Sequence, residues 1–524
     1  MPWLVPEDVR GSSPKQDDTF NKKDSTQPGS HRDQVIQWLP SLETHLARSC
    51  ALASLGERLP TTVPVGFPDL IKSDRDWSGS NFESEGDYVY ILSPEDLAES
   101  ETALHSFLAL SSNPDLDQIS PETFPLPQLG VKLRELSETV HVGRGFCIIR
   151  GIDPTRYSPI ESMILYAGIT SYIGSTRACQ DDRGNRVIHI KDRGRDFPGV
   201  DHRQPPYSNV GQPFHSDHCD IVALFFVDTA AQGGSSKLAS SAKIYNEIAA
   251  TRPDVIHILA SNTWKFDNWE IRPILLDFGP YGPAFCFSRR SLTGSPYATR
   301  QVEVPPLTER QAEALDLVQF TAAKHALSMQ LQPGDIQIVN NWAALHSRDG
   351  FTDNPKPGGK RRHALRLWLR NEENAWPTPG PLEHIWKEIY SKDSPWAKDP
   401  HWDLVPPIDW QHASKLDFTS LENFYHNVNS VAGLVKQFFR DPPEPLFTSY
   451  LPDAHYAILR AVILHLNKVQ EHYTSNRMSA GSLAIYFGPT LMSANSGGNI
   501  ADAGWQVRMI ETILNNTFQI FDDD

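Results

Sequence analysis

The 524-residue chain has few cysteines, no excess of positive charge and no long apolar run. Its five cysteines are odd in number, widely spaced and free of CxxC pairs, which disfavours a disulfide framework and favours a reducing compartment. The net charge of −16 argues against a nucleic-acid partner, because no general phosphate-binding surface is expected. No stretch approaches the roughly 18 apolar residues of a membrane helix, and no signal-like segment opens the chain. We therefore expect a soluble, cytoplasmic protein without membrane insertion.

The length and the local composition predict more than one folded unit, because 524 residues exceed what one hydrophobic core usually serves. Residues 1–34 are rich in Ser, Asp, Lys and Pro and have little to bury, so we expect a disordered tail. Helical spacing of apolar residues begins near Val35. We expect a first domain over 35–400, with a helical extension at its start, and a second over 401–524.

The spacing of apolar residues predicts a mixed architecture for the first domain and a smaller all-α region after it. From 187 to 370 short apolar runs alternate with Gly- and Pro-rich turns, which is typical of a sandwich or barrel with helices packed outside. A Pro- and Trp-dense segment at 376–410 is expected to be an irregular tail and linker. The remaining assignments are strands at 86–92 and 143–152, helices at 94–110, 158–174 and 307–327, and helices after 411.

A candidate metal site begins in the stretch PFHSDHCDI at 213–221. In a strand, His215 and Asp217 would share one face, since side chains two apart point the same way. An imidazole and a carboxylate at one point suit a divalent metal such as Fe(II), although an isolated HxD triplet is a weak signal. His346, in a turn-like setting after the apolar strand IQIVNN, can supply the third ligand.

Two arginines four residues apart, Arg362 and Arg366, lie in the apolar stretch KRRHALRLWLR at 360–370. An inward-facing arginine in such a strand needs an anionic partner. Two histidines and one carboxylate leave three positions open on Fe(II), enough for a chelating 2-oxoacid and dioxygen. The far carboxylate of 2-oxoglutarate would suit a guanidinium better than an ammonium group.

These stretches, with GGSS at 233–236, resemble the taurine dioxygenase (TauD/TfdA) superfamily of Fe(II)/2-oxoglutarate oxygenases, and GRGFCIIRGI and AWPTPGPL extend the likeness over about 85–395. The resemblance implies a distorted double-stranded β-helix (jelly roll) that binds iron through His215, Asp217 and His346. It implies that Arg362 pairs with the far carboxylate of 2-oxoglutarate, with Arg361 as the alternative. Ser236 stands where the family often has a threonine that helps to hold 2-oxoglutarate. Arg366 would face an anionic group of the substrate or serve 2-oxoglutarate.

The three residues after Asp217 depart from the family's pattern. An aromatic residue commonly follows the HxD triplet in that family, but His218 and Cys219 stand here. We interpret His218, Cys219 and Asp220 as structural residues, because a buried cysteine is more often a small core residue than a ligand. The sequence therefore does not predict which residues form the wall of the substrate pocket.

A second resemblance covers about 411–524. VAGLVKQFFRDPPEPLF at 431–447 and NRMSAGSLAIYFGPTLM at 476–492 resemble the C-terminal half of Rho GTPase-activating protein (RhoGAP) domains. The likeness implies that Lys436 is that family's helix lysine, that Arg440 steadies its catalytic loop, and that Thr490 replaces an asparagine. No arginine lies between Arg370 and Arg440, so the inserted arginine, worth roughly 10³–10⁵ in rate, is missing.

The leading hypothesis is thus an Fe(II)/2-oxoglutarate-dependent dioxygenase that oxidises a small organic substrate, with 2-oxoglutarate and dioxygen as co-substrates. The second region is interpreted as a truncated RhoGAP fragment, either a natural fusion remnant or a wrongly joined gene model. The alternative function is signal transduction, through binding or activation of a Rho-type GTPase, although binding is easier to expect than acceleration of hydrolysis. A third hypothesis is a catalytically silent scaffold.

Overall fold

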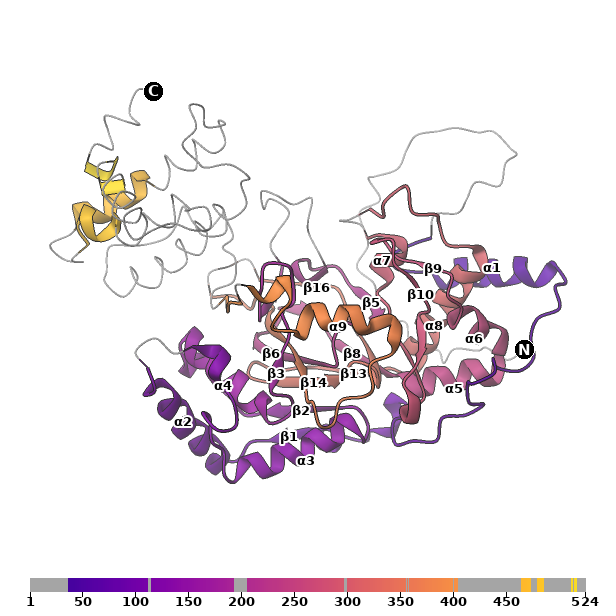
Figure 1. Ribbon diagram of the computed structural model, residues 1–524, viewed down its shortest axis with the longest axis horizontal. Coiled ribbons are helices and arrows are strands. Elements are labelled where there is room, and N and C mark those ends of the chain that lie inside the picture. Colours follow the sequence, from indigo (N-terminus) through magenta and orange to yellow (C-terminus); the bar gives the residue numbers. More distant parts are fainter. Residues whose placement is uncertain are drawn as a thin grey trace. The chain divides into compact units, whose positions relative to one another are not determined.

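A computed structural model describes residues 36–111, 115–192, 205–295, 299–354, 356, 358–398, 400–403, 463–472, 478–484, 510–511 and 513–515 (Figure 1). The chain divides into two compact units, 1–36 and 37–524. The tail expected at 1–34 lies outside the described residues, as do Lys436, Arg440 and Thr490. The helices and strands of the described residues all belong to the unit 37–524.

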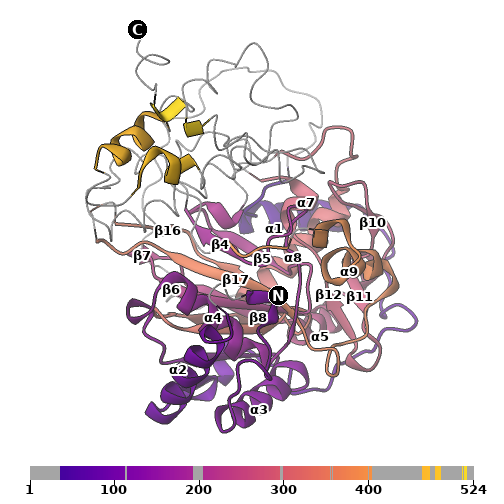
Figure 2. The same cartoon turned by 60° about the vertical axis from the view of Figure 1, so that its left-hand side comes forward.

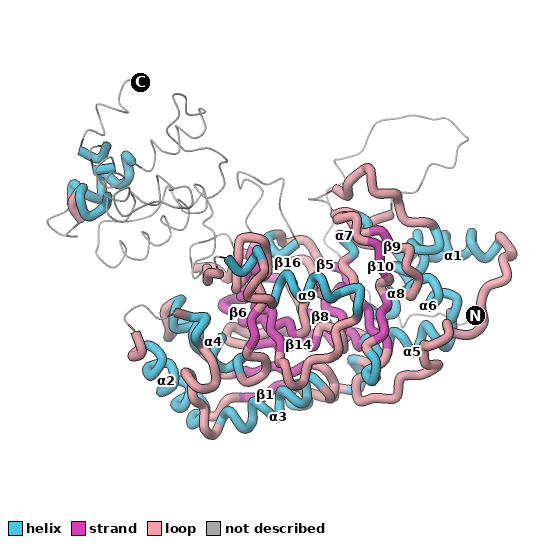
Figure 3. The backbone as a smooth tube through the Cα atoms, viewed as in Figure 1, coloured by secondary structure: helices cyan, strands magenta, loops and turns pink. Residues whose placement is uncertain are grey.

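Two main sheets form the centre of the described region, where the strands lie between helices (Figure 3). One has the order β1–β2–β14–β6–β17–β3, with β4 also paired to β17; the other has the order β13–β8–β15–β5. Only the β1–β2 pairing is parallel. The strands are β1 (Val89–Ile91), β2 (Phe146–Arg150), β14 (Ile336–Asn340), β6 (Ile221–Asp228), β17 (His363–Arg370), β3 (Thr176–Arg177), β4 (Ile188–Lys191), β13 (Leu327–Met329), β8 (Ser236–Ser240), β15 (Ala344–Arg348) and β5 (Gln212–His215). The expected mixed architecture of short strands and flanking helices is confirmed.

Three helices, α2 (Pro94–Leu108), α3 (Leu129–His141) and α4 (Pro159–Ser171), lie along the large sheet (Figures 1 and 2). Their apolar side chains share one core with strands β2, β14, β6 and β17. Burying each large apolar side chain contributes about 1.5–3 kcal/mol. Helix α4 begins at the expected capping box, in which the Ser158 side chain accepts from the Glu161 N–H and the Glu161 carboxylate accepts from the Ser158 N–H. This core holds the strands that carry much of the site described below.

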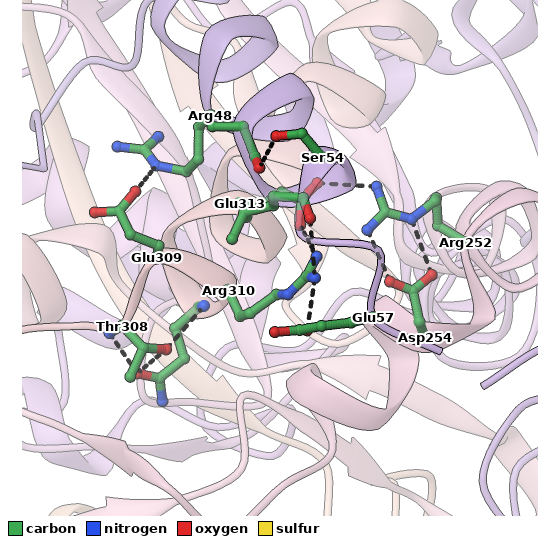
Figure 4. Close-up of polar contacts among 12 residues, drawn as sticks. Arg48, Ser54, Glu57, Arg252, Asp254, Thr308, Glu309, Arg310 and Glu313 are labelled. Atoms are coloured by element: carbon green, nitrogen blue, oxygen red, sulfur yellow. Dashed lines mark hydrogen bonds and ion pairs between the residues drawn. The ribbon is translucent and has the colours of Figure 1, made fainter. Parts of the chain in front are cut away.

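A second group of helices packs beside the small sheet: α1 (Leu42–Ser54), α5 (Ser241–Thr251), α6 (Pro253–Leu259) and α8 (Glu309–His325). Ion pairs join them (Figure 4). The buried Glu313 carboxylate bridges Arg252 and Arg310, at 3.0 and 3.4 Å. One turn further along α8, Asp316 pairs with Arg48 and Arg289, both at 2.6 Å. Removing one partner of such a buried pair typically costs about 3–5 kcal/mol, so these contacts fix α8 against its neighbours.

The segment expected to be irregular at 376–410 contains a helix, α9 (Glu383–Tyr390), and that expectation is wrong for this part. Ile385, Trp386 and Ile389 recur at helical spacing and are buried against the strands. In the sequence, the prolines around this segment made its short helical spacing hard to recognise. Short 3₁₀ turns flank the helix at Gly380–Leu382 and Pro395–Lys398.

The remaining described elements are small. Besides further 3₁₀ turns, they comprise α7 (Arg289–Thr293) and the two-stranded pairs β7 (Gln232–Gly233) with β16 (Phe351–Thr352), β9 (Trp264–Lys265) with β10 (Ile271–Arg272), and β11 (Leu275–Asp277) with β12 (Pro283–Phe285). After residue 403 the described residues are short helical pieces, including 463–471 and 480–484. Within the described ranges no helix has both the length and the apolar character needed to cross a membrane.

Candidate active site

Two histidines face each other across the small sheet. His215 is the last residue of β5, and His346 is the central residue of β15, directly opposite it in the antiparallel register. Their ring centroids lie 4.2 Å apart. The expectation that His346 sits in a turn is wrong, because the chain turns at 341–343 and then begins β15. The strand IQIVNN and His346 therefore belong to different sheets.

Asp217 reaches the same point from a loop rather than from a strand. Strand β5 ends at His215, so the alternation argument does not place Asp217. Instead the buried Asn341 side chain accepts the Asp217 N–H at 2.8 Å and donates to the carbonyls of Asp217 and Cys219, at 2.6 and 2.8 Å. Asp217 Oδ1 then lies 3.8 Å from His215 Nε2 and 3.9 Å from His346 Nε2. One ligand atom from each of the three residues falls within 4.8 Å of the others.

The second oxygen of Asp217 is already hydrogen-bonded. Oδ2 accepts from Arg366 Nη1 at 2.9 Å and from Trp368 Nε1 at 3.0 Å, both on β17. Burial alone would raise the pKa of this carboxyl group, but the positive charge of Arg366 and the Trp368 hydrogen bond favour the carboxylate, and the pKa lies well below its usual range. Asp217 is therefore a carboxylate that presents one oxygen, Oδ1, to the two histidines.

The surroundings of both imidazoles favour the neutral ring, which offers a nitrogen lone pair. His215 Nδ1 donates to the Pro213 carbonyl at 2.9 Å, which leaves Nε2 as the acceptor nitrogen. Burial lowers the pKa of His215, and burial together with the neighbouring His215 ring lowers that of His346 to about 3. Two neutral imidazoles and one carboxylate oxygen match the donor set that a ferrous ion takes in a facial triad. The side chains present fit such a metal.

A cavity of about 50 Å³ adjoins these three residues and contains both arginines of the β17 stretch. Arg362 precedes β17, and its backbone N–H donates to Asp353 Oδ1 at 2.8 Å. Its side chain is buried, and Nη1 has no hydrogen-bond partner in the described part of the chain. Burial lowers the pKa of Arg362 to about 10. Arg362, rather than Arg361, lines the cavity.

Ser236 and Arg366 line the same cavity but have different neighbours. Ser236 opens β8, and its hydroxyl donates to Gln337 Oε1 on β14 at 3.0 Å. Arg366 donates to Gln180 Oε1 at 2.8 Å in addition to its bond with Asp217. Its guanidinium thus binds the Asp217 carboxylate, while its contact with a substrate or with 2-oxoglutarate stays a prediction.

Sequence reasoning missed the residues that hold the loop of Asp217. Asp220, whose side chain is buried, accepts from Arg370 Nη1 at 2.8 Å and from the indole N–H groups of Trp386 and Trp342, at 3.0 and 3.3 Å. Arg366 and Arg370, four apart on β17, therefore anchor the two ends of the loop 217–220. Their spacing in RLWLR was the available signal, but it did not indicate which acids they bind.

His218 and Cys219 lie in the same loop. Burial and the nearby Arg272 lower the pKa of His218 to about 4, and burial raises that of Cys219. Cys219 belongs to the apolar cluster under α9. Among the described residues, the candidate ligand group consists of His215, Asp217 and His346, and neither His218 nor Cys219 belongs to it.

Comparison with known proteins gives two separate matches. The model of the taurine catabolism dioxygenase TauD, TfdA family matches residues 111–368. The taurine hydroxylase-like protein SAT17 of Stachybotrys chartarum is 36% identical over 363 residues, which cover 64% of this chain and 93% of that protein. A solved structure of asparagine oxygenase with Fe(II), 3-hydroxyasparagine and succinate covers 55% of this chain and 95% of its own, at 17% identity and a TM-score of 0.42.

The second match falls in the C-terminal region. The RhoGAP domain model matches residues 448–496. Beta-chimaerin of Rattus norvegicus is 29% identical over 129 residues, which cover 19% of this chain and 44% of that protein. The chain therefore spans less than half of this relative's length.

Proposed function

The chain belongs to the taurine catabolism dioxygenase TauD, TfdA family of Fe(II)/2-oxoglutarate-dependent oxygenases, and we propose that it hydroxylates a small organic substrate beside His215, Asp217 and His346. One observation carries the proposal: candidate ligand atoms of His215, Asp217 and the sequence-distant His346 lie within 4.8 Å of one another. In this proposal they bind one ferrous ion through His215 Nε2, Asp217 Oδ1 and His346 Nε2. When bound, the iron supplies the redox chemistry that couples decarboxylation of 2-oxoglutarate to succinate and CO₂ with oxidation of the substrate by dioxygen.

The neighbouring residues divide the remaining tasks. Arg366 and Trp368 occupy Asp217 Oδ2, which directs Oδ1 toward the metal position. We propose that Arg362 binds the far carboxylate of 2-oxoglutarate, because its buried Nη1 has no partner within the described ranges. Ser236, on the same cavity, is proposed to add a hydroxyl to that contact.

The arrangement of the two main sheets supports a finer proposal for the fold. The cavity is lined by β5, β8 and β15 of the small sheet and by β6, β14 and β17 of the large one. A site enclosed between two largely antiparallel sheets is typical of a jelly roll. We propose that the sheets form the distorted double-stranded β-helix, within a domain over 35–400, followed by a RhoGAP-like region over 401–524.

An anaerobic titration tests the oxygenase proposal. Fe(II) and 2-oxoglutarate added together under nitrogen should give a weak visible charge-transfer band, which should be absent in His215→Ala and Asp217→Ala. His105→Ala, a change at an exposed histidine of α2, is the matched control and should keep the band. An unchanged band in both site variants would contradict the assignment.

A second candidate function comes from the RhoGAP match at 448–496. We propose that this region can bind a Rho-type GTPase without accelerating hydrolysis, because no arginine lies between Arg370 and Arg440. Pull-down with GTP-loaded Rho-type proteins tests binding, and phosphate release tests hydrolysis. A stimulation of phosphate release that Arg440→Ala abolishes would overturn the second half of this proposal.

A further inference from the structure

A second buried arginine, Arg348, lines the cavity beside Arg362. Arg348 lies two residues after His346 in β15, so both side chains point to the same face of that strand. It is also paired in register with Ser236 of β8, another residue of the cavity wall. Sequence reasoning had not singled out this position.

Only part of the Arg348 guanidinium is used by the protein. Nη2 donates to the backbone carbonyls of Ser208 and Val210, both at 2.7 Å. Nε is buried and has no hydrogen-bond partner in the described structure. A buried charged donor without a partner is costly. An arginine that served only to hold the segment 208–210 would not need to leave this donor unpaired.

The two guanidinium groups lie on one aromatic ring. Arg348 lies 4.9 Å and Arg362 5.6 Å from the centroid of the Phe351 ring. Burial and the proximity of Arg362 lower the pKa of Arg348 to about 9. In the ranges that the structure describes, neither guanidinium forms an ion pair with a carboxylate. Asp349, next to Arg348 in the sequence, pairs with Lys237, and Asp353 accepts from the backbone N–H of Arg362. Two buried cations at one end of a cavity favour an anionic ligand there.

We propose that Arg348 is a second binding residue for the far carboxylate of 2-oxoglutarate, acting together with Arg362. This inference rests on the proposed oxygenase function. Arg362 offers Nη1 and Arg348 offers Nε, two buried guanidinium donors that have no partner among the described residues. A 2-oxoacid that lacks the far carboxylate has no group to contact either donor, so the arginine pair selects for a dicarboxylic co-substrate.

Calorimetric titration of the full-length Fe(II) protein under nitrogen tests this inference without using turnover. Two ligands are compared: 2-oxoglutarate and pyruvate, a 2-oxoacid without the far carboxylate. Arg348→Gln should weaken the binding of 2-oxoglutarate by about 10- to 100-fold, the range for loss of one hydrogen bond to a charged group. It should leave the affinity for pyruvate unchanged. Arg348→Lys keeps the charge and should fall between Arg348→Gln and the wild type.

Two further variants separate the possible failures. Arg362→Gln should also weaken the binding of 2-oxoglutarate, and Arg58→Gln, at an exposed arginine, should change nothing. If Arg362→Gln weakens binding and Arg348→Gln does not, the role of Arg348 is overturned while the oxygenase function stands. If Arg348→Gln weakens the binding of 2-oxoglutarate and of pyruvate equally, Arg348 serves only to hold the local backbone, and the inference is overturned as well. If the wild type binds neither ligand, the proposed function itself fails.

Discussion

Asn341 offers a sharp test of how the candidate metal loop is held. Its side chain makes three hydrogen bonds to the loop, one from the Asp217 N–H and two to the carbonyls of Asp217 and Cys219. Asn341→Ala removes all three and leaves three loop groups unpaired in a fully buried position. At about 0.5–1.5 kcal/mol for each bond, we expect a loss of roughly 2–4 kcal/mol in the free energy of unfolding.

The same change should weaken iron binding, because Asp217 would lose the contacts that fix its backbone. Loss of a group that orients a metal ligand typically costs about 10- to 100-fold in affinity. Urea unfolding of the metal-free protein measures the first effect, and anaerobic Fe(II) titration measures the second. Asn262→Ala, at an exposed asparagine, is the control. Unchanged iron affinity in Asn341→Ala would refute the reasoning that this side chain positions Asp217.

Three further predictions address other contacts. Arg366→Gln should lower Fe(II) affinity by about 10- to 100-fold, because Asp217 Oδ2 loses its charged donor, whereas Arg361→Gln should leave Fe(II) affinity close to the wild-type value in the same titration. A chain ended after residue 399 should melt at a lower temperature than one ended after Asp403, because the backbone of His401 bonds to Gly184 and Arg186 and the Trp402 indole bonds to Asp117. Equal melting of the two truncated chains would contradict this. Burial alone would raise the pKa of Glu247, but hydrogen bonds from His325 and Lys324 outweigh burial and lower the pKa. The Glu247 carboxylate therefore stabilises the fold above the ordinary pKa of 4.5, and this stabilisation is lost as the pH falls through the lowered pKa. In Glu247→Gln, the free energy of unfolding measured with urea should therefore fall less steeply as the pH is lowered into the acid range. An unchanged dependence of this free energy on pH would refute the assignment.

Features that depend on a local pattern of residues could be predicted from the sequence. Short apolar runs between turns indicated a sandwich or barrel with outer helices, and Ser158 with Glu161 marked the start of α4. The PFHSDHCDI stretch and His346 drew attention to residues that the structure brings together. These signals are local because strand periodicity and helix caps depend on neighbouring residues.

Long-range contacts were not predictable from one sequence. The pairing of His215 with His346 depends on the register of β5 against β15, which tertiary packing sets. Arg366 pairs with Asp217 only because β17 passes the loop after β5. The importance of Asn341 depends on its burial, and that of Arg348 on its burial and its unpaired donor. Neither property can be predicted from composition or from the spacing of residues.

The central claim is that one ferrous ion binds between His215, Asp217 and His346. Anomalous diffraction at the iron edge, from crystals grown anaerobically with Fe(II), tests it most directly. We expect one strong peak per chain, within coordination distance of His215 Nε2, Asp217 Oδ1 and His346 Nε2. A peak elsewhere, or no peak at this position in crystals with an intact loop at 217–220, would contradict the account.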